Sequence, residues 1–495
     1  MTDNWKRIVR TMRTKEKHMK KTKYLAACIA AMMALLVMGC RSGDDDEHGI
    51  DYDAEKWVIA GTTLVRYTGV EADVRIPDGV TVIGESAFKY RGGVVTSVTL
   101  PESVKIIEDS AFSGCTRLAE VKMPAGLAML GEYAFQSTSL ASVEIPASVK
   151  SIAGSAFQYC TSLAEVTIPD SVESIGWSAF YGCTSLEEVK YGGTLSQWCQ
   201  VDDDGSSLTS YATSVKLSDG SDLKSLTTLE IPSDVTKIRA YAFNNCKEIA
   251  EVKFPGSVKS IGAGAFSGCT SLANVTIPDS VETIEGSAFS GCTSLASVTI
   301  GGSVESIGDW AFYECTSLES VTIPGSVESI GDWAFYKCTS LESVTIPASV
   351  KSIEDRAFYE CTSLESVTIG GSVESIGNYA FYGCKSLESV TIPGSVKSIG
   401  SDAFSNCTSL ESVTIGEGVE SIGDWAFNYC TSLASVTIPA SVKSIEDYAF
   451  NQCWILTEVN YGGTAEQWKQ IDIGSSAFSS GVKITDKDGN VISNS

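Results

Sequence analysis

The chain has 495 residues, and its 36 basic and 61 acidic side chains give a formal net charge of −25. This net negative charge argues against nucleic acid or anionic lipid as the main ligand, since both are themselves negatively charged and would repel the chain. The two histidines, His18 and His48, lie near the amino end, so the rest of the chain has no histidine for acid–base catalysis, a Ser-His-Asp triad or zinc binding.

Residues 1–39 are interpreted as a secretory signal peptide. A basic segment, Lys20–Lys23, precedes an apolar run that is too short for a membrane-spanning helix, and Met19 would be a more ordinary start than Met1. The run ends in Val-Met-Gly-Cys40, which resembles the lipobox of bacterial lipoproteins. That resemblance implies that Cys40 is acylated and holds the protein at a membrane. The alternative is a plain cleaved signal with an incidental cysteine.

Residues 40–54 form the predicted lipidated tether. The segment Arg41-Ser-Gly-Asp-Asp-Asp-Glu47 is similar to the acidic signal that sends lipoproteins of the Bacteroides group to the outer face of the outer membrane. The predicted location is therefore the outer membrane, with the protein facing the cell exterior. A solvated acidic tether is the alternative interpretation, and both can hold.

A 23-residue unit repeats through most of the chain. One copy runs from Ser320 to Glu342, and nearly the same text starts again at Ser343. An Ala-Phe pair marks every copy, and from Phe243 to Phe450 the phenylalanines recur every 23 residues without a break. One unit cannot bury its own apolar face, so the copies must stack into a solenoid.

An interruption divides the repeats into two arrays, residues 75–188 and 221–458. A motif, Tyr-Gly-Gly-Thr followed two residues later by Gln-Trp, opens the interruption at Tyr191 and returns at Tyr461 near the carboxyl end. A motif that closes the second array is expected to close the first, so residues 189–220 are interpreted as a cap-like insert. The alternative is a single solenoid with a bulged insert.

Caps are predicted at both ends of the repeats, because an open coil would expose its apolar face. Residues 55–74 read as a hairpin with a glycine turn, and residues 459–495 form the C-terminal cap, with a closing hairpin around Asp488-Gly489.

Each unit is predicted to contain two short strands and a turn. Val344 and Ile346 alternate with polar residues, which is the pattern of a strand with one buried face, and Ile353 lies on a second extended segment. The segment that starts at Asp332 is expected to make one or two helical turns. Its Phe335 should point inward, so that the phenylalanines stack through the core.

The pattern Leu-x-x-Val-x-Ile-Pro followed by Ile-Gly-x-x-Ala-Phe-x-x-Cys resembles the BspA-type (Treponema-type) leucine-rich repeats over most of the chain. The resemblance implies an α/β repeat fold: a curved, right-handed leucine-rich-repeat solenoid with short strands and a short helical turn per coil, and β-hairpin-like caps. It also implies a place on a bacterial or protozoan surface. Members of the family act as adhesins for host matrix proteins or other bacteria, and none of the signature positions is catalytic.

Thirteen of the sixteen cysteines share one repeat position, and adjacent coils would bring them within disulfide reach. A disulfide or metal ladder is one interpretation. We favour buried free thiols, because a uniform ladder offers no unique pairing and zinc-type Cys-x-x-Cys pairs are absent. The thirteen are Cys115, Cys160, Cys183 and the ten from Cys246 to Cys453.

Two polar rows accompany the repeats. The first is a row of glutamates, Glu319, Glu342, Glu365, Glu388 and Glu411, which suggests either weak calcium binding across coils or, as we favour, a solvated surface. The second is a row of Ser and Thr side chains such as Ser320 and Thr322. Regular threonines can order water in ice-binding proteins, but neighbouring charges disfavour that function here.

Aromatic residues flank the Ala-Phe pairs and give the candidate ligand-binding surface. Exposed aromatics beside carboxylates suit a protein or a glycan, and the alternative is that the rings pack from coil to coil. The candidates are Trp310, Trp333, Trp425, Tyr379 and Tyr448 before the pair, and Tyr313, Tyr336, Tyr359 and Tyr382 after it.

These features predict a cell-surface protein without catalytic residues, metal or cofactor, which acts as an adhesin or protein-interaction scaffold. The expected partner is an extracellular protein, either of the host matrix or of another bacterial surface. A glycan-binding lipoprotein of a polysaccharide-uptake system is the alternative. A repeat stalk that carries an enzyme domain is disfavoured, since no segment outside the repeats is long enough to form one. We expect a monomer that contacts the membrane only through its lipid and does not bind nucleic acid.

Overall fold

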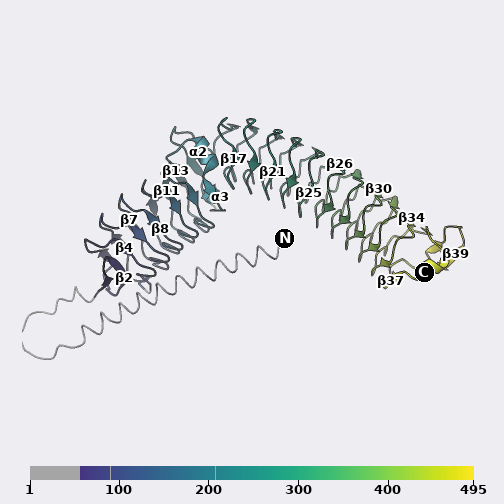
Figure 1. Ribbon diagram of the computed structural model, residues 1–495, viewed down its shortest axis with the longest axis horizontal. Helices are drawn as coiled ribbons and strands as arrows, with labels where there is room; N and C mark the ends of the chain where they lie inside the picture. Colours follow the sequence, from purple (N-terminus) through teal and green to yellow (C-terminus); the bar gives the residue numbers. More distant parts are fainter. Residues whose placement is uncertain (1–55, 90, 207, 495) are drawn as a thin grey trace, which may run out of the picture.

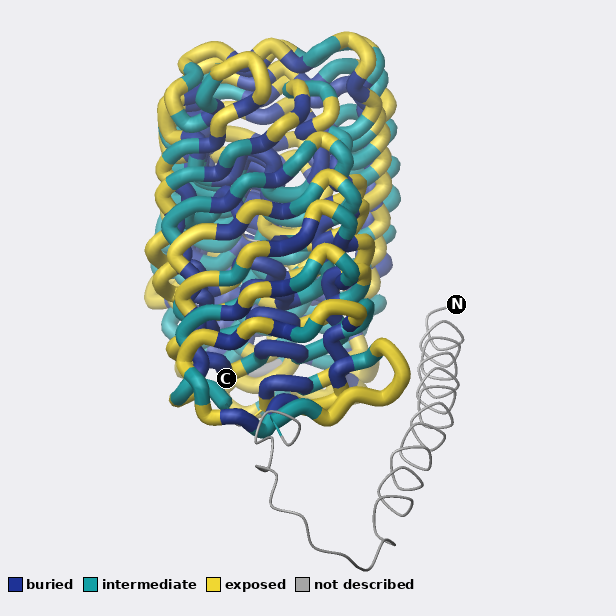
Figure 2. The backbone as a smooth tube through the Cα atoms, turned by 90° about the vertical axis from the view of Figure 1, so that its left-hand side faces the viewer, coloured by how far each residue is buried: buried dark blue, intermediate teal, exposed yellow. Residues whose placement is uncertain are grey.

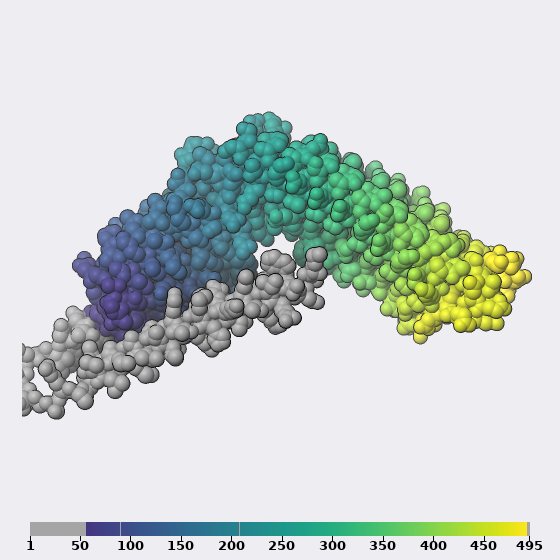
Figure 3. All heavy atoms as spheres, viewed as in Figure 1, coloured from purple at the N-terminus to yellow at the C-terminus, as the bar shows by residue number. Residues whose placement is uncertain are grey.

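The computed structural model is an arched rod, with β2 (Thr63–Tyr67) near one end and β39 (Val491–Asn494) at the other (Figure 1). The structure describes residues 56–89, 91–206 and 208–494. The predicted signal peptide, Cys40 and the acidic tether lie outside the described residues. The space-filling view shows the coils packed side by side into one continuous body (Figure 3).

Each coil contributes one strand to each of two parallel sheets. The first strands of the later coils form a sheet of β16 (Thr228–Glu230), β18 (Glu251–Lys253), β20 (Asn274–Thr276), β22 (Ser297–Thr299), β24 (Ser320–Thr322), β26 (Ser343–Ile346), β28 (Ser366–Ile369), β30 (Ser389–Ile392), β32 (Ser412–Ile415), β34 (Ser435–Ile438), β36 (Glu458–Tyr461), β38 (Lys483–Thr485) and β39. The second strands form a sheet of β17 (Lys237–Ile238), β19 (Ser260–Ile261), β21 (Thr283–Ile284), β23 (Ser306–Ile307), β25 (Ser329–Ile330), β27 (Ser352–Ile353), β29 (Ser375–Ile376), β31 (Ser398–Ile399), β33 (Ser421–Ile422), β35 (Ser444–Ile445) and β37 (Asp472–Ile473).

The earlier coils follow the same plan in shorter sheets. Their second strands join β1 (Trp57–Ala60) and β2 to β4 (Val82–Ile83), β6 (Ile106–Ile107), β8 (Met129–Leu130), β10 (Ser151–Ile152), β12 (Ser174–Ile175) and β14 (Asp202–Asp203). Their first strands form two sheets, one of β3 (Asp73–Arg75), β5 (Ser97–Thr99) and β7 (Glu120–Lys122), the other of β9 (Ser142–Glu144), β11 (Glu165–Ile168), β13 (Glu188–Tyr191) and β15 (Ser214–Lys216).

The strands pair in register, so each position of the unit lies beside its own copy. Val344 pairs with Val367 in the next coil, and Ile353 with Ile376. Val344 and Ile346 are buried while the intervening Thr345 is exposed, because successive side chains of a strand point to opposite faces. The buried residues run as one core along the rod (Figure 2), which confirms the predicted solenoid of 23-residue coils.

The segment after the second strand differs from the predicted helix, because it is a series of tight turns. The amides of Ala334 and Tyr336 donate to carbonyls three residues back, whereas those of Trp333, Phe335 and Lys337 donate to the next coil. Trp333 and Lys337 accordingly adopt a left-handed backbone, with φ of 59° and 55°. An α-helix would direct all its amides along its own axis, so the bonds to the next coil exclude it.

The inward phenylalanines stack as predicted. The ring centroids of Phe335, Phe358 and Phe381 lie 5.2 Å apart in succession with nearly parallel planes, and all three side chains are fully buried. Because each ring touches one ring in each neighbouring coil, the stack links the stability of adjacent coils.

Replacing Phe358 by Ala is expected to lower the free energy of unfolding by about 3–5 kcal/mol, the usual cost of emptying a buried phenylalanine site. Urea denaturation followed by circular dichroism measures this loss. Phe88→Ala is the matched control near the end of the array, where hydrogen exchange should speed up mainly in the first coils. If both variants lost protection from hydrogen exchange equally along the whole rod, the idea that each coil is stabilised mainly by its neighbours would be contradicted.

Hairpins close the rod at its two ends, as predicted. Strands β1 and β2 pair antiparallel at the amino end, and β38 and β39 pair antiparallel at the carboxyl end. The first hairpin extends the sheet of second strands, whereas the last hairpin extends the sheet of first strands.

The two Tyr-Gly-Gly-Thr motifs each start a short helix that the sequence analysis did not predict. In α2 (Leu195–Gln200), Thr194 and Gln197 form a reciprocal capping box, and α4 (Ala465–Trp468) begins in the same way. The ring of Tyr191 packs edge-on against Trp198 at 5.2 Å. Gly193 is required there, since a Cβ atom would lie 2.6 Å from the Tyr191 ring.

Helices α2 and α3 (Leu208–Tyr211) lie where the earlier sheets end and the later ones begin (Figure 1). The backbone amide of Arg239 donates to the carbonyl of Cys199 at 2.7 Å, and the indole nitrogen of Trp198 donates to the carbonyl of Ala242 at 3.0 Å. The insert therefore connects the coil before it to the coil after it through buried hydrogen bonds.

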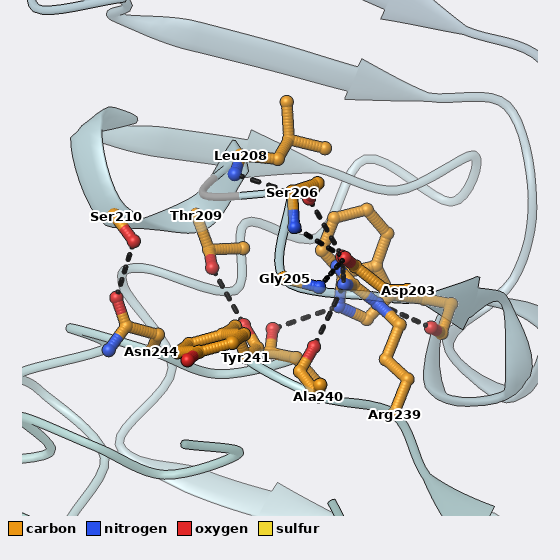
Figure 4. A network of polar contacts seen from close by, with 12 residues as sticks. Asp203, Gly205, Ser206, Leu208, Thr209, Ser210, Arg239, Ala240, Tyr241 and Asn244 are labelled. Carbon is orange, nitrogen blue, oxygen red and sulfur yellow. Dashed lines mark hydrogen bonds and ion pairs between the residues drawn. The ribbon is translucent and has the colours of Figure 1, made fainter. Parts of the chain in front are cut away.

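A buried ion pair lies at the centre of this junction (Figure 4). Arg239 and Asp203 form a salt bridge with side chains almost fully buried, and the guanidinium lies 4.0 Å from the centroid of the Trp198 ring. Two bonds from Ser206, one from its amide and one from its hydroxyl, also reach the Asp203 carboxylate. The network joins residues 36 positions apart in sequence, so it couples the two sides of the insert.

Candidate functional site

The cysteine row is part of the core. All fourteen cysteines among the described residues are free and buried, which agrees with the prediction of buried thiols. The Cys361 sulfur donates to the carbonyl of Phe335 in the preceding coil at 3.2 Å, and the same bond recurs in neighbouring coils. Burial raises the pKa of Cys361 to about 12. A thiol that stays protonated is a poor nucleophile and metal ligand, so this row supports no chemistry at neutral pH.

The glutamate row lies on the surface. Glu319, Glu342 and Glu365 are exposed beside the first strands. In the part of the chain that the structure describes, no group of three or more His, Cys, Asp or Glu side chains is placed to hold a metal ion. Within the same residues, no helix has the length and apolar character needed to cross a membrane.

The tight turns around the Ala-Phe pairs form one edge of the rod, which we call the turn edge. Four of the predicted ligand-binding residues form a tyrosine column on this edge. The rings of Tyr313, Tyr336, Tyr359 and Tyr382 stack face to face, with successive centroids 4.8, 4.9 and 4.8 Å apart. The rings are half-buried, and the Tyr382 hydroxyl accepts a hydrogen bond from Asn406 at 2.8 Å. Packing between coils therefore covers the faces of these rings and leaves their edges for contact.

The other five predicted residues belong to a second column, which precedes the Ala-Phe pairs. Its successive members are Trp310, Trp333, Arg356, Tyr379, Asp402, Trp425 and Tyr448. Trp310 is 44% exposed and the other aromatic members are half-buried. The rings of Trp425 and Tyr448 stack at 4.3 Å, and Trp333 lies 4.9 Å from Tyr336 in the tyrosine column. The structure thus brings the nine predicted residues onto one edge, as two neighbouring columns.

A row of acidic side chains lies beside the second column. The Asp309 carboxylate accepts a hydrogen bond from the amide of Asp332 in the next coil at 2.9 Å, and Asp332 accepts one from Asp355 at 2.9 Å. Burial, with a smaller contribution from the nearby Asp309, raises the pKa of Asp332. The turn edge is therefore both aromatic and negatively charged, a combination that attracts cationic groups.

Several exposed aromatics on the turn edge were missed from the sequence. Trp177 is 60% exposed, and Tyr159 and Tyr181 meet edge-on at 5.6 Å in the earlier coils. Trp454 is 67% exposed in the last complete coil, where most other coils have threonine. The signal was present in the repeat alignment, since Tyr181 occupies the same position as Tyr336.

A family model decides the relationship of this chain to known proteins. The model described as BspA type leucine rich repeat region matches more than half of the sequence, over residues 81–200, 221–342, 259–388 and 351–485.

The chain belongs to the BspA-type leucine-rich-repeat family.

The matched ranges leave out residues 201–220, the part of the insert that carries α3, in agreement with the break in the repeat there. No curated protein matches the sequence.

Solved structures of other leucine-rich-repeat proteins resemble this BspA-type chain. One from Bacteroides ovatus is 24% identical, with a TM-score of 0.41, and the match covers 86% of this chain and 94% of that one. One from Eubacterium ventriosum is 25% identical with a TM-score of 0.49, covering 64% and 87%. A leucine rich cell surface protein from Faecalibacterium prausnitzii is 27% identical with a TM-score of 0.37, covering 87% and 98%.

Membership of the BspA-type family accounts for the scaffold positions of each coil. Val344, Ile346, Phe358 and Cys361 are buried and repeat almost unchanged along the later coils. The positions that differ between coils lie mainly on the turn edge.

Proposed function

We propose that this chain is a non-catalytic bacterial surface protein that binds an extracellular protein through its aromatic turn edge. Cys40 is the site of lipid attachment in this proposal, and the lipid holds the rod at the outer face of the outer membrane. The partner is a host matrix protein or a surface protein of another bacterium.

The observation that carries the proposal is the combination of aromatic and acidic side chains on one edge of a rigid rod. Buried Val, Ile and Phe rows fix the coils, so the columns hold their side chains at defined spacings. Trp and Tyr side chains supply much of the binding energy at protein interfaces. The exposed face of the long sheet offers mainly Ser, Thr and Glu, which contribute less.

Replacing two rings of the edge is expected to weaken partner binding by about tenfold or more. The variant is Trp310→Ser with Tyr336→Ser, because the preceding coils have Ser287 and Ser290 at these positions. Ser287 has a φ of 58°, so serine fits the left-handed backbone that Trp310 adopts. Surface plasmon resonance against a panel of matrix proteins and bacterial surface proteins measures the change.

The control removes side chains from the other face, with Thr322→Ala and Thr345→Ala, which are both exposed on the long sheet. This control should bind as tightly as the unmodified protein. A loss of binding in the control, with none in the ring variant, would overturn the proposal for the turn edge.

A glycan ligand remains the second candidate, and the exposed ring of Trp177 is the observation that favours it. A parallel panel of polysaccharides separates the two candidates, since binding to glycans alone would replace the protein partner. If the protein bound neither the protein panel nor the polysaccharide panel, both candidate functions would be refuted.

The proposed location is tested on intact cells. Protease added outside the cells should digest the rod, and Cys40→Ser should release the protein from the membrane fraction. A protein that resists protease on intact cells but not after lysis would contradict surface display.

A further inference from the structure

The second column contains one cation, Arg356, which lies between two aromatic rings. The guanidinium of Arg356 lies 4.6 Å from the ring centroid of Trp333 in the coil before it. It also lies 4.6 Å from the ring centroid of Tyr379 in the coil after it. Two rings that are two coils apart therefore enclose one planar cation between them, in a cation–π arrangement.

The same order of residues, with an aromatic residue on each side, recurs two coils later without the cation. Asp402 occupies the position of Arg356, and its flanking residues in the column are Tyr379 and Trp425. The φ values of Arg356, Asp402 and Trp425 are 57°, 56° and 60°, so the backbone presents the three side chains in the same way. An aspartate side chain is shorter than an arginine, so it cannot lie across the faces of its two neighbours as Arg356 lies across Trp333 and Tyr379.

The charges around Asp402 also favour a cation. Hydrogen bonds from Tyr379 and Ser405 reach its carboxylate, and Asp424 is the acidic group near it. Among the described residues, no basic side chain forms an ion pair with Asp402. Burial raises the pKa of this carboxyl group, with a further contribution from Asp424. A carboxylate with aromatic neighbours and a second acid beside it therefore lacks the cation that would compensate its charge.

We propose that the space above Asp402, between Tyr379 and Trp425, binds an arginine side chain of the protein partner. The guanidinium would lie between the two rings as Arg356 lies between Trp333 and Tyr379, and would pair with the Asp402 carboxylate. This inference rests on the proposed function and assigns a chemical class to the partner: a protein with an exposed arginine on its binding surface.

The test uses the full chain and a capped hexa-arginine peptide, with the hexa-citrulline peptide as its neutral isostere. Calorimetric titration at an ionic strength of about 0.15 M limits long-range attraction to this acidic protein. Asp402→Asn is expected to weaken binding of hexa-arginine by about tenfold. Hexa-citrulline should bind the unmodified protein no more tightly than hexa-arginine binds Asp402→Asn, because it has the shape of hexa-arginine without its charge.

Two further variants test the geometry. Asp402→Arg should fill the space with a side chain of this chain, as Arg356 does, and abolish binding at the site. Arg356→Ser should open the space between Trp333 and Tyr379 and raise the number of bound peptides. Circular dichroism of each variant shows whether the solenoid is retained.

The matched control is Glu305→Gln, which removes the same charge from an exposed position beside the second strands. If Asp402→Asn and Glu305→Gln weaken binding equally, the peptide binds the net charge and the inference is overturned. Equal binding of hexa-citrulline to the unmodified protein overturns it as well. If the partner binds Asp402→Asn normally but not the ring variant Trp310→Ser/Tyr336→Ser, this inference fails while the proposed function holds.

Discussion

Raising the pH above about 9 is expected to lower the free energy of unfolding steeply. The buried cysteines lose their protons in the unfolded chain at this pH but keep them in the folded chain. Burial raises the pKa of Cys315, Cys361 and Cys407 from 9.0 to about 12. Between these pH values the unfolded state binds fewer protons than the folded state, so stability falls as the pH rises. Each thiol contributes about 1.4 kcal/mol per pH unit in this window. Urea denaturation at a series of pH values, in the presence of a reductant, measures the loss.

The matched control for this effect is supplied by the chain itself. Thr138 occupies the cysteine position in one coil, and its hydroxyl donates to the carbonyl of Phe135 at 2.9 Å. Replacing Cys315, Cys361 and Cys407 by Thr should therefore keep a hydrogen-bond donor and remove the titration. The pH dependence should then shrink by about 1.4 kcal/mol per pH unit for each thiol replaced. Stability that is constant between about pH 9 and pH 11 in the unmodified protein would contradict the buried, protonated row.

Replacing Asp203 by Asn is expected to destabilise the junction by about 3–5 kcal/mol, because it leaves the Arg239 charge buried without a counter-ion. Since the Arg239 network connects the two sides of the insert, we also expect unfolding to separate into two transitions. Calorimetry and urea denaturation of the full chain measure both effects.

An exposed ion pair provides the comparison for this variant. Lys253 and Glu230 lie 2.7 Å apart with side chains 53% and 72% exposed, so Glu230→Gln should change stability far less than Asp203→Asn does. A single transition in Asp203→Asn, with a loss as small as that of Glu230→Gln, would show that the buried pair does not couple the arrays.

The rows of the core could be predicted because the repeat places like residues side by side. The spacing of Val344, Ile346 and Phe335 was enough to predict which side chains are buried and how the strands stack. The turn could not be predicted in the same way. Its local sequence favours a helix, and it is the bonds from Trp333 and Phe335 to another coil that give a different backbone.

The junction shows the same limit. The Thr-x-x-Gln spacing of the capping box was readable at Thr194, so α2 was within reach of sequence analysis. The partnership of Asp203 with Arg239 was not, because Asp203 lies in the insert, where no repeat period indicates which residues are its neighbours. The sole local sign is that Arg239 stands where most other coils have glycine or an acidic residue.

For the candidate site, the period predicted which aromatics share an edge but not how far each is exposed. Exposure depends on the neighbouring coils: Tyr336 is covered by Tyr313 and Tyr359, whereas the coil before Trp177 has Gly154 at the same position, and Trp177 is largely exposed. The binding role of the nine predicted residues stays a prediction for the experiments above.

The hydrogen bonds between coils run along the rod, and this direction has a mechanical consequence. A load applied between the two ends passes through every interface between coils, and each interface can open by itself, since each coil is bonded only to its neighbours. Each coil that peels away releases 23 residues, which extend to about 80 Å. Under such a load the rod would lengthen in steps, one coil after another, and would not break in a single event.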